Sequence, residues 1–449
     1  MLTHTDVNVA PAVLRKVVTA AALGNFVEWF DFAVYGFLAT TLATEFFPSA
    51  SLNHGLLKTF GVFAVAFAMR PLGGLLLGPL GDKLGRKSVL SLTILMMAGA
   101  TTLIGCLPAY ASIGIMAPVL LTLLRCIQGF SAGGEYGGSV SYVMEHAPRD
   151  RRGQYGGFIS MSTFTAFAFA ALLVFGLESS LPVLSMESWG WRIPFLVAAP
   201  LGAVGIYLRL RLEETPAFQA ISAFQATKVR SNLGRTLRQQ VGAMCYLGMF
   251  IALTALSFYT FSTYFATFLQ VSGKFSRPEA LLISTIALVF AAALCPVCGR
   301  FTDKVGRRCS MGLICAWVLL TAVPAFWLAG AGSLFLAVLG VLLLAVGVLA
   351  SNVVTAPLLS EVFPTHSRYT ASALTYNLSY TLFGGTAPLV ATWLIGQTGS
   401  SLAPAFYLMA ISVLAALGGL SLPETSRISL TEADLQSDGQ GFAAAVGGI

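Results

Sequence analysis

The stretch Asp82-Lys83-Leu84-Gly85-Arg86-Lys87 recurs in the second half of the chain as Asp303-Lys304-Val305-Gly306-Arg307-Arg308. A second pair of segments follows at nearly the same offset, because Glu145-x-x-Pro148-x-x-x-Arg152 returns as Glu361-x-x-Pro364-x-x-x-Arg368. Each copy lies between long apolar runs, at the equivalent place in its half. Two different segments repeated at almost one offset predict a duplicated membrane unit, an arrangement typical of transporters.

The composition indicates that lipid is the main solvent of this chain. Of its 449 residues, 56% are hydrophobic and 10% are charged, whereas about a quarter of the residues of a soluble domain are charged. A chain crosses lipid as helices or as a closed barrel, and the apolar runs here are continuous rather than alternating, which predicts helices. The net charge of +7 falls largely in short loops between the runs, so we expect no nucleic-acid partner.

The apolar runs predict an all-α membrane protein with twelve transmembrane helices, because about 20 apolar residues span a bilayer. The predicted spans are 17–43, 56–80, 88–108, 114–142, 154–176, 192–210, 241–269, 279–299, 310–330, 333–359, 369–396 and 403–421. The longest polar stretch divides six spans from six. The predicted organisation is two pseudo-symmetric six-helix bundles at 1–210 and 240–422, a linker at 211–239 and a frayed tail at 423–449.

Basic residues follow every even-numbered span, whereas the loops at the other end hold few of them. By the positive-inside rule the even-numbered loops, the linker and both termini are cytoplasmic. This predicts a multi-pass protein of a bacterial inner membrane, that is, the plasma membrane. We expect a monomer whose surroundings are membrane lipid. The first span contains Glu28 and Asp31, so it does not read as a cleavable signal peptide.

Several stretches carry a resemblance to a known family. The Gly81-Asp82-x-x-Gly85-Arg86-Lys87 motif is accompanied by 24–32 (GNFVEWFDF), 70–74 (RPLGG), 128–136 (QGFSAGGEY), 189–195 (WGWRIPF) and 213–216 (EETP). With these, the whole chain resembles the major facilitator superfamily and, within it, the metabolite:proton symporter group. The resemblance implies the major facilitator fold. It also implies proton-coupled uptake, because members of the group carry proline and betaine osmolytes, citrate, 2-oxoglutarate, shikimate and similar solutes.

Two branches of that group remain as alternatives for the solute. The first span and the stretch 212–218 (LEETPAF) are most similar to the proline/betaine porters, which favours an osmolyte. Those porters have a long charged C-terminal extension, and Lys at the position of Arg125. The Arg, the run 258–264 (FYTFSTY) and the run 383–388 (FGGTAP) are closer to the citrate and 2-oxoglutarate carriers. A drug or metabolite exporter is the less favoured reading, because the fifth span has no proline.

Acids inside the first span are candidates for proton coupling. Glu28 and Asp31 are three residues apart and share a helix face. Carboxylates this close disfavour double ionisation, so one of them is a candidate to take up a proton. Ionisable groups within a span face a cavity or a partner. The alternative is that both are structural, in ion pairs with Arg70 or Arg125.

The fourth span carries Arg125, Gln128 and Glu135, which project to about one side of a helix. A guanidinium pairs bidentately with a carboxylate, so Arg125 and Gln128 are candidates to bind the solute and Glu135 joins the proton-coupling set. A static ion pair is the alternative role for Arg125. Arg70 lies about eleven residues before the motif, roughly 16 Å at helical rise, and is a further candidate for binding or for pairing with Asp31.

The repeated charged segments predict a cytoplasmic gate that holds the outward-open state. Its Gly residues permit tight turns, and Asp82 is expected to cap a neighbouring helix or to meet a basic residue across the pseudo-symmetric interface. The gate residues are Asp82, Arg86, Glu145, Arg152, Asp303, Arg307, Glu361 and Arg368.

Aromatic and amide side chains are candidates to shape the solute site, because aromatic faces hold quaternary ammonium groups by cation–π attraction. Packing is the more ordinary role of such residues in a membrane. The candidates are Tyr35, Tyr136, Tyr259, Tyr264, Tyr376, Asn377 and Trp393.

Other chemistry is not indicated. No His has metal-ligand spacing, and Cys295-x-x-Cys298 has no second pair near it, so we expect no metal. No Walker loop occurs, which leaves protons rather than ATP as the energy source, with no cofactor. No catalytic set of an enzyme is legible.

Overall fold

The structure is a computed structural model that describes residues 11–49, 51–84, 86–133, 140, 143–211, 233–426 and 428. The front half contains α1 (Pro11–Phe37), α2 (Ala39–Phe46), α3 (Leu52–Ala68), α4 (Arg70–Leu84), α5 (Arg86–Cys106), α6 (Tyr110–Ile113), α7 (Met116–Ala132), η1 (Arg149–Arg151), α9 (Arg152–Ser180), α10 (Val183–Ser185), η2 (Met186–Gly190) and α11 (Arg192–Arg211). The back half contains α13 (Leu233–Tyr259), η3 (Thr260–Tyr264), α14 (Phe265–Val271), α15 (Arg277–Val305), α16 (Arg307–Ala329), α17 (Leu334–Glu361), α18 (Thr365–Ser379), η4 (Tyr380–Gly384), α19 (Ala387–Thr398) and α20 (Ala403–Ser421).

The helices account for the twelve predicted spans. In the described part of the chain, nine helical stretches are long and apolar enough to cross a membrane. A tenth forms if Val183–Gly190 and Arg192–Tyr207, bent by 44° at their junction, are taken together. Two shorter apolar helices, Ser91–Cys106 and Met116–Ala132, occupy the third and fourth predicted spans. The fold is therefore the predicted all-α membrane architecture of twelve helices.

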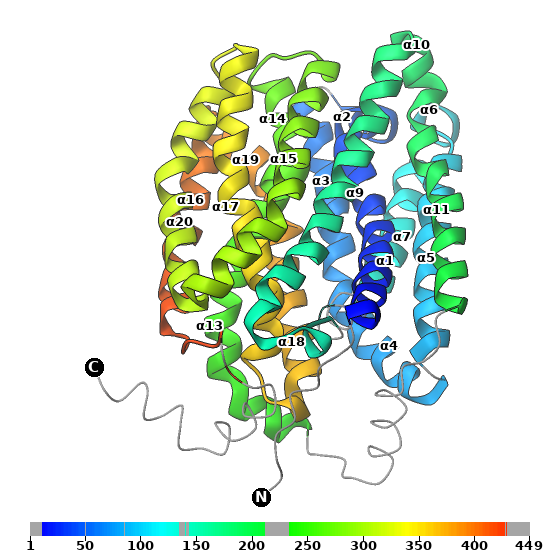
Figure 1. Cartoon of the computed structure of the whole chain (residues 1–449). Coiled ribbons are helices and arrows are strands. Elements are labelled where there is room, and N and C mark those ends of the chain that lie inside the picture. Colours follow the sequence, from blue (N-terminus) through cyan, green and yellow to red (C-terminus); the bar gives the residue numbers. More distant parts are fainter. Residues whose placement is uncertain are drawn as a thin grey trace, which may run out of the picture.

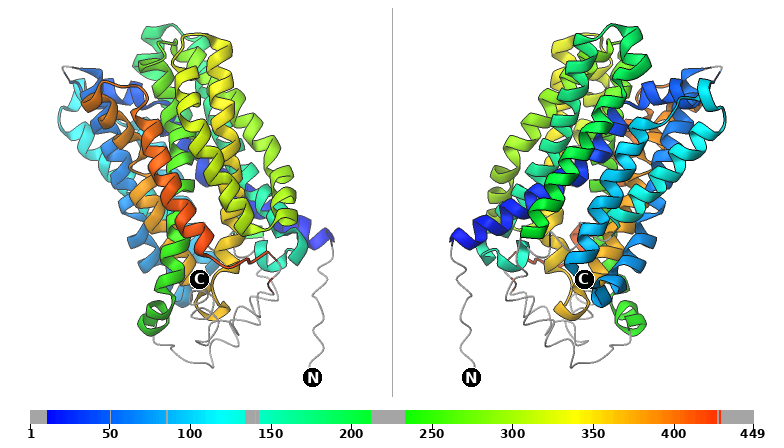
Figure 2. Two further views of the ribbon diagram at one scale, coloured as in Figure 1. Left: turned by 90° about the vertical axis from the view of Figure 1, so that its left-hand side faces the viewer. Right: turned by 90° about the vertical axis from the view of Figure 1, so that its right-hand side faces the viewer.

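The two halves lie side by side as separate groups of helices (Figure 1). The front half, coloured blue to green, meets the back half, coloured green to red, chiefly where α9 packs against α15 and α17, and also where α3 packs against α19. The two turned views in Figure 2 show that the long helices of both groups run between the same two ends of the molecule. We call the end that carries Arg152, Arg307 and Arg308 the basic end.

Several boundaries differ from the predicted ones. The helices α11 and α13 take residues from both sides of the predicted linker 211–239, since α11 ends at Arg211 and α13 begins at Leu233. The predicted eighth span ended at 299, but α15 continues to Val305. Asp303, whose charge suggested a loop in the sequence, is paired with Arg307 inside the protein, so α15 can continue past it. Residues 212–232 and 429–449 lie outside the described residues.

Candidate functional site

Two buried arginines lie at the centre of the front half, and local features of the sequence bring them there. Pro71 lacks a backbone donor, and the helix is interrupted at Met69, so Arg70 becomes the first residue of α4. Arg125 lies on α7, which approaches α3 closely at Gly129, where an added Cβ would lie 1.7 Å from the Ala66 carbonyl oxygen. Arg70 is 1% exposed and Arg125 is 0% exposed.

Arg70 lies in a cage of aromatic rings beside an acid. Its guanidinium carbon is 4.7 Å from the centroid of Phe32, 4.6 Å from that of Phe67 and 5.7 Å from that of Trp29. Its Nη2 is 4.0 Å from Glu28 Oε1. Nε and Nη2 make no hydrogen bond to a described residue. Arg70 therefore faces Glu28, rather than Asp31, as its acidic partner.

Arg125 has its own set of partners. Its Nη1 donates to Gln128 Oε1 at 2.8 Å, and Gln128 Nε2 donates to Thr101 Oγ1 at 2.5 Å. The guanidinium carbon lies 4.1 Å from the ring centroid of Tyr35 and 5.3 Å from that of Phe32. Nε and Nη2 lack a hydrogen-bond acceptor among the described residues. The predicted alignment of Arg125 and Gln128 is confirmed, and two donors of the guanidinium are left for a further acceptor.

Asp31, on α1 like Glu28, is the fourth charged side chain at this centre. Its side chain is 1% exposed and lies near Arg125 and Thr101. Neither carboxylate oxygen reaches full hydrogen-bonding geometry with a described residue. A buried carboxylate in this condition is costly and is the kind of group that a proton or a ligand would satisfy.

Aromatic rings connect this charged centre with the back half. The Trp29 ring of α1 lies 5.3 Å from Phe258, 6.3 Å from Tyr259 and 6.5 Å from Tyr380. Tyr259 and Tyr380 stand at the junctions where α13 and α18 pass into the π-helical segments η3 and η4. Such π-helical turns are frequent at functional sites. The rings therefore form the contact between the two halves at the level of the arginines.

The sequence did not single out the residues of this aromatic contact. Trp29, Phe32, Phe67 and Tyr380 are aromatic residues among many apolar ones, and no pattern distinguishes them, although Trp29 and Phe32 lie inside the 24–32 stretch. Of the predicted aromatic residues, Tyr35 and Tyr259 lie at the centre, and Tyr376 stacks on Tyr380 with centroids 4.0 Å apart.

Other predicted site residues lie elsewhere. Asn377 Nδ2 donates to the Gly133 carbonyl at 2.9 Å, which ties α18 to the end of α7. The Trp393 side chain is 51% exposed on the outer surface, so it does not shape a solute site. Glu135 and Tyr136 lie outside the described residues, so their predicted roles stay predictions.

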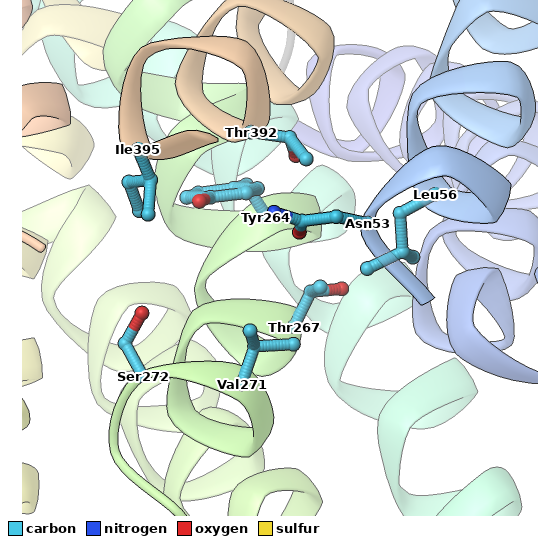
Figure 3. A pocket seen from close by; sticks show the side chains of 8 residues that line it. All are labelled: Asn53, Leu56, Tyr264, Thr267, Val271, Ser272, Thr392 and Ile395. Atoms are coloured by element: carbon cyan, nitrogen blue, oxygen red, sulfur yellow. The ribbon is translucent and has the colours of Figure 1, made fainter. Parts of the chain in front are cut away.

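Tyr264 lies toward the end of the molecule that is opposite to the basic end. It lines a pocket of about 10 Å³, near the minimum for a single water. The pocket is formed by α3, η3, α14 and α19, as Figure 3 shows. Close by, the Phe60 and Tyr264 rings pack edge to face at 6.2 Å, and Thr40 Oγ1 donates to Gln270 Oε1 at 3.3 Å. Each of these contacts joins the front half to the back half, so the two halves also meet at this end.

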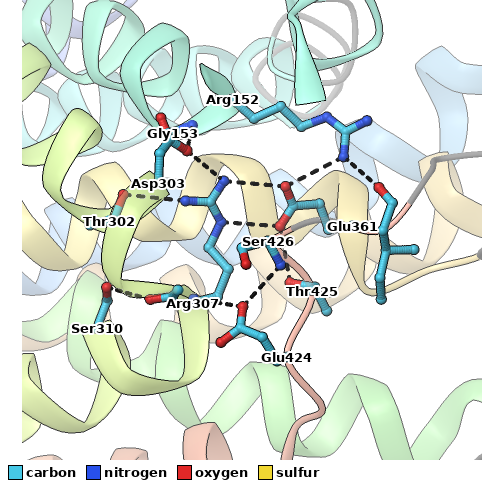
Figure 4. Close-up of polar contacts among 12 residues, drawn as sticks. Arg152, Gly153, Thr302, Asp303, Arg307, Ser310, Glu361, Glu424, Thr425 and Ser426 are labelled. Atoms are coloured by element: carbon cyan, nitrogen blue, oxygen red, sulfur yellow. Dashed lines mark hydrogen bonds and ion pairs between the residues drawn. The ribbon is translucent and has the colours of Figure 1, made fainter. Parts of the chain in front are cut away.

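The basic end is closed by a buried ionic network (Figure 4). Arg307 donates from Nε and Nη2 to both oxygens of Glu361, at 3.2 Å and 3.3 Å, and from Nη2 to Asp303 at 3.0 Å. Arg152, from the front half, lies 3.6 Å from the same Glu361 carboxylate. The network therefore links the two halves.

Asp303 makes a second link between the halves. Its two carboxylate oxygens accept the backbone N–H groups of Gly153 and Gln154, at 2.7 Å and 2.9 Å, in the first turn of α9. This is the helix capping that the sequence predicted for the equivalent Asp82. Only Gly306, with φ +95°, separates α15 from α16, so the second charged repeat is a tight turn rather than a loop.

The remaining gate candidates divide into two groups. Arg368 lies 3.8 Å from Glu145, which joins the halves a third time. The side chains of Asp82 and Arg86 lie outside the described part of the structure, so their roles stay predictions.

The segment after α20 completes the network and was missed by the sequence, which predicted a frayed tail. Glu424 accepts the backbone N–H groups of Arg307 and Arg308 at 2.8 Å and 3.0 Å, at the first turn of α16. Thr425 donates to Glu361 at 3.0 Å, and Arg152 donates to the carbonyl of Ile428 at 2.9 Å. We call residues 424–428 the C-terminal strap. Its described residues bind the buried charges of both halves, which the sequence motif alone did not indicate.

Comparisons with known proteins agree with this architecture. The ectoine/proline transporter of Corynebacterium glutamicum is 37% identical over 95% of this chain and 87% of its own length. The proline/betaine transporter of Escherichia coli K12 is 38% identical over 92% of this chain and 84% of its own length. The structure of the proton:xylose symporter XylE bound to 6-bromo-6-deoxy-D-glucose superposes with a TM-score of 0.75 at 18% identity, over 95% of this chain and 99% of that one. The family model of the Major Facilitator Superfamily matches residues 21–385, and the chain belongs to this superfamily.

Proposed function

We propose that this protein takes up a small zwitterionic osmolyte of the proline or glycine betaine type together with protons, by alternating access. The observation that carries the proposal is the set of unsatisfied groups at the centre. Among the described residues, Arg70 and Arg125 each have two buried nitrogens without an acceptor, and Asp31 has two oxygens without a full donor. Buried polar groups are normally satisfied. The carboxylate of a small solute would supply the acceptor that the two arginines lack, and a proton would satisfy Asp31.

The charge balance favours a zwitterion over a citrate-like solute. The described charged side chains at the centre are two arginines and two acids, Glu28 and Asp31, all at most 2% exposed. A zwitterion enters this balanced set without adding net charge. A di- or tricarboxylate would add two or three negative charges to a buried site, where uncompensated charge is costly.

The relatives support the same class of solute. Their names describe transporters of ectoine and proline or of proline and betaine, and they match this chain over nearly its whole length. These solutes share a carboxylate and a cationic or delocalised nitrogen centre. The carboxylate would meet the free donors of Arg125 and Arg70, with Gln128 holding Arg125 in place through the 2.8 Å hydrogen bond.

We assign the coupling proton to Asp31. Glu28 has Arg70 as an ionic neighbour at 4.0 Å, whereas neither oxygen of Asp31 has a full hydrogen bond to a described residue. Protonation of Asp31 would remove the negative charge that competes with the solute carboxylate for the nearby Arg125, so solute binding would favour the protonated carrier. The energy source is the proton gradient, and the protein transports its solute without altering it chemically.

The networks at the two ends act as gates in this account. The basic end is cytoplasmic by the positive-inside rule, and its network of Arg152, Arg307 and Glu361 would break when the carrier opens inward. The contacts of Tyr264 and Gln270 would break when it opens outward. We propose a monomer in a bacterial inner membrane, with both termini in the cytoplasm.

Uptake into proteoliposomes tests the proposed function. With an inward proton gradient, radiolabelled glycine betaine or proline should accumulate above the equilibrium level, and a protonophore should abolish the accumulation. Accumulation of citrate with no response to glycine betaine or proline would replace the osmolyte by a carboxylate. Loss of preloaded solute driven by the same gradient would replace uptake by export.

A further inference from the structure

We infer that the rings of Trp29, Phe32 and Phe67 form the subsite for the quaternary or secondary ammonium group of the solute, and that Arg70 holds this subsite in the present structure. The inference rests on the proposed function and names which residues of the site recognise the cationic half of the zwitterion.

The cage already holds a cation. The Arg70 guanidinium lies within 6 Å of all three ring centroids, at 4.6 Å, 4.7 Å and 5.7 Å, which is the range of a cation–π contact. Two of its nitrogens have no acceptor among the described residues. Among the described residues, the position therefore favours a positive charge that requires few hydrogen-bond acceptors. A trimethylammonium group, which has no N–H to donate, fits that requirement better than a guanidinium does.

Arg70 has an alternative place when the solute's cation enters. Glu28 Oε1 lies 4.0 Å from Arg70 Nη2, beyond hydrogen-bonding distance, so movement of the guanidinium out of the cage toward Glu28 would convert this approach into a hydrogen-bonded ion pair. The solute's own carboxylate is the second available acceptor. The cation of the solute and the charge of Arg70 would thus exchange positions, and the site would stay balanced.

Asn25 positions the Trp29 ring. Asn25 Oδ1 accepts from Trp29 Nε1 at 2.8 Å, and Asn25 Nδ2 donates to Ser162 Oγ at 2.8 Å and to Thr163 Oγ1 at 2.7 Å. The amide is buried and has partners for both its oxygen and its nitrogen, so the indole is fixed to α9 through one side chain. Asn25 does not contact the cage's cation, and it acts through Trp29.

The Trp29 ring also links the proposed ammonium subsite to the back half. Trp29 contacts Phe258, Tyr259 and Tyr380 of the back half. A cation held against Trp29 therefore lies at the contact surface between the halves. A solute that binds more tightly when the two halves are in contact would favour that state over the inward-open and outward-open states, because a ligand shifts the population toward the state that it binds better.

A pair of solutes of nearly equal shape tests the inference. Glycine betaine carries a trimethylammonium group, and 3,3-dimethylbutanoate carries an uncharged tert-butyl group in its place. Binding of both to the purified protein would be measured by competition against radiolabelled glycine betaine or proline. We expect the wild type to prefer glycine betaine by about tenfold or more, as cation–π contacts in a desolvated site allow.

The variant Trp29→Leu should reduce this preference to about twofold or less, because both solutes lose packing against the ring but only glycine betaine loses a cation–π attraction. Trp29→Phe should retain most of it, which keeps the test valid if the leucine variant folds poorly. Asn25→Ala should lower the preference partly, since the ring remains but loses its orientation. Trp327→Leu, at a tryptophan that is 64% exposed, is the matched control and should leave the preference unchanged.

An unchanged preference in Trp29→Leu, with both solutes weakened equally, would overturn the subsite and leave the proposed function standing. A wild type that binds neither glycine betaine nor proline would overturn the proposed function itself, and the subsite with it.

Discussion

Glu361 receives both donors of the Arg307 fork, at 3.2 Å and 3.3 Å, while Arg152 of the other half lies 3.6 Å from the same carboxylate. One buried acid therefore holds two arginines that belong to different halves. Removing a single partner of such a network leaves the others buried and uncompensated, which costs more than the network contributes when complete. The connection must nevertheless break in each transport cycle if the halves rock.

Glu361→Gln should impair transport more than solute binding. The amide keeps the shape of the acid but leaves the charges of Arg152 and Arg307 without a common anion. We expect the uptake rate in proteoliposomes to fall about tenfold or more and the affinity for glycine betaine, by competition binding, to change by less than about threefold.

Asp150→Asn is the matched control for Glu361→Gln, since the Asp150–Arg151 pair at the same end has both side chains more than half exposed, at 75% and 62%. Exposed pairs contribute little, so this variant should transport normally. Equal losses of uptake and binding in Glu361→Gln would contradict a gate and indicate a general loss of structure.

The C-terminal strap should protect the first turn of α16. Glu424 accepts the N–H groups of Arg307 and Arg308, so Glu424→Ala should raise amide hydrogen exchange at these two positions by about tenfold. Ser421→Ala, which removes only a hydroxyl bonded within its own helix, is the control. Unchanged protection in Glu424→Ala would mean that the strap does not hold the network.

The strap should be insensitive to pH near neutrality. Burial alone would raise the pKa of Glu424, but the backbone N–H groups of Arg307, Ser426 and Arg308 outweigh it and lower the pKa below the ordinary 4.5. With a folded-state pKa below the unfolded one, the stabilisation is complete above pH 4.5 and is lost as pH falls through the lower folded value. Protection factors at Arg307 and Arg308 should stay constant from about pH 7 to about pH 5. A loss of protection in that window would contradict the assignment.

Asp31→Asn should separate proton coupling from solute movement. The amide cannot release a proton, so the gradient should no longer drive accumulation, while exchange of labelled for unlabelled solute across the membrane should continue. Glu28→Gln is the comparison, because Glu28 lies beside Arg70. This variant should weaken binding but leave residual uptake dependent on the gradient. Gradient-driven accumulation by Asp31→Asn at the wild-type level would move the proton to another group.

The contact between α7 and α3 at Gly129 should be essential for the fold. A Cβ there would lie 1.7 Å from the Ala66 carbonyl oxygen, whereas at Gly61 of α3 it would meet nothing within 4 Å. Gly129→Ala should lower the melting temperature of the detergent-purified protein sharply, since overpacking of this degree forces the backbone apart. Gly61→Ala should leave it equal or slightly higher, because alanine favours a helix by up to about 1 kcal/mol. Equal melting temperatures would contradict the close approach.

The sequence could predict the features that rest on repeated segments or on charges within apolar spans. The Asp303 and Arg307 repeat led to the gate, and the acids and arginines of the apolar spans led to Glu28, Asp31, Arg70 and Arg125, because a charge in lipid demands an explanation. The twelve spans followed from lengths of apolar sequence, which lipid thickness fixes directly.

The sequence could not predict which of these groups meet. Arg70 lies beside Glu28 rather than Asp31, because the break at Met69 and the packing of α4 and α7 decide its direction. Trp29 was overlooked, since an aromatic residue among many apolar ones has no signal of its own until the other half supplies Phe258 and Tyr380. The strap was overlooked because Glu424 accepts from the backbone N–H groups of Arg307 and Arg308, 117 and 116 residues away, and backbone partners have no pattern in the sequence.

The most direct test of the central claim is uptake of radiolabelled glycine betaine by wild-type proteoliposomes with and without an imposed inward proton gradient, beside Asp31→Asn. We expect accumulation above equilibrium in the wild type only with the gradient, and equilibration without accumulation in the variant under both conditions. Accumulation that is independent of the gradient, or equal in wild type and variant, would contradict a proton-coupled osmolyte carrier centred on Asp31 and the two arginines.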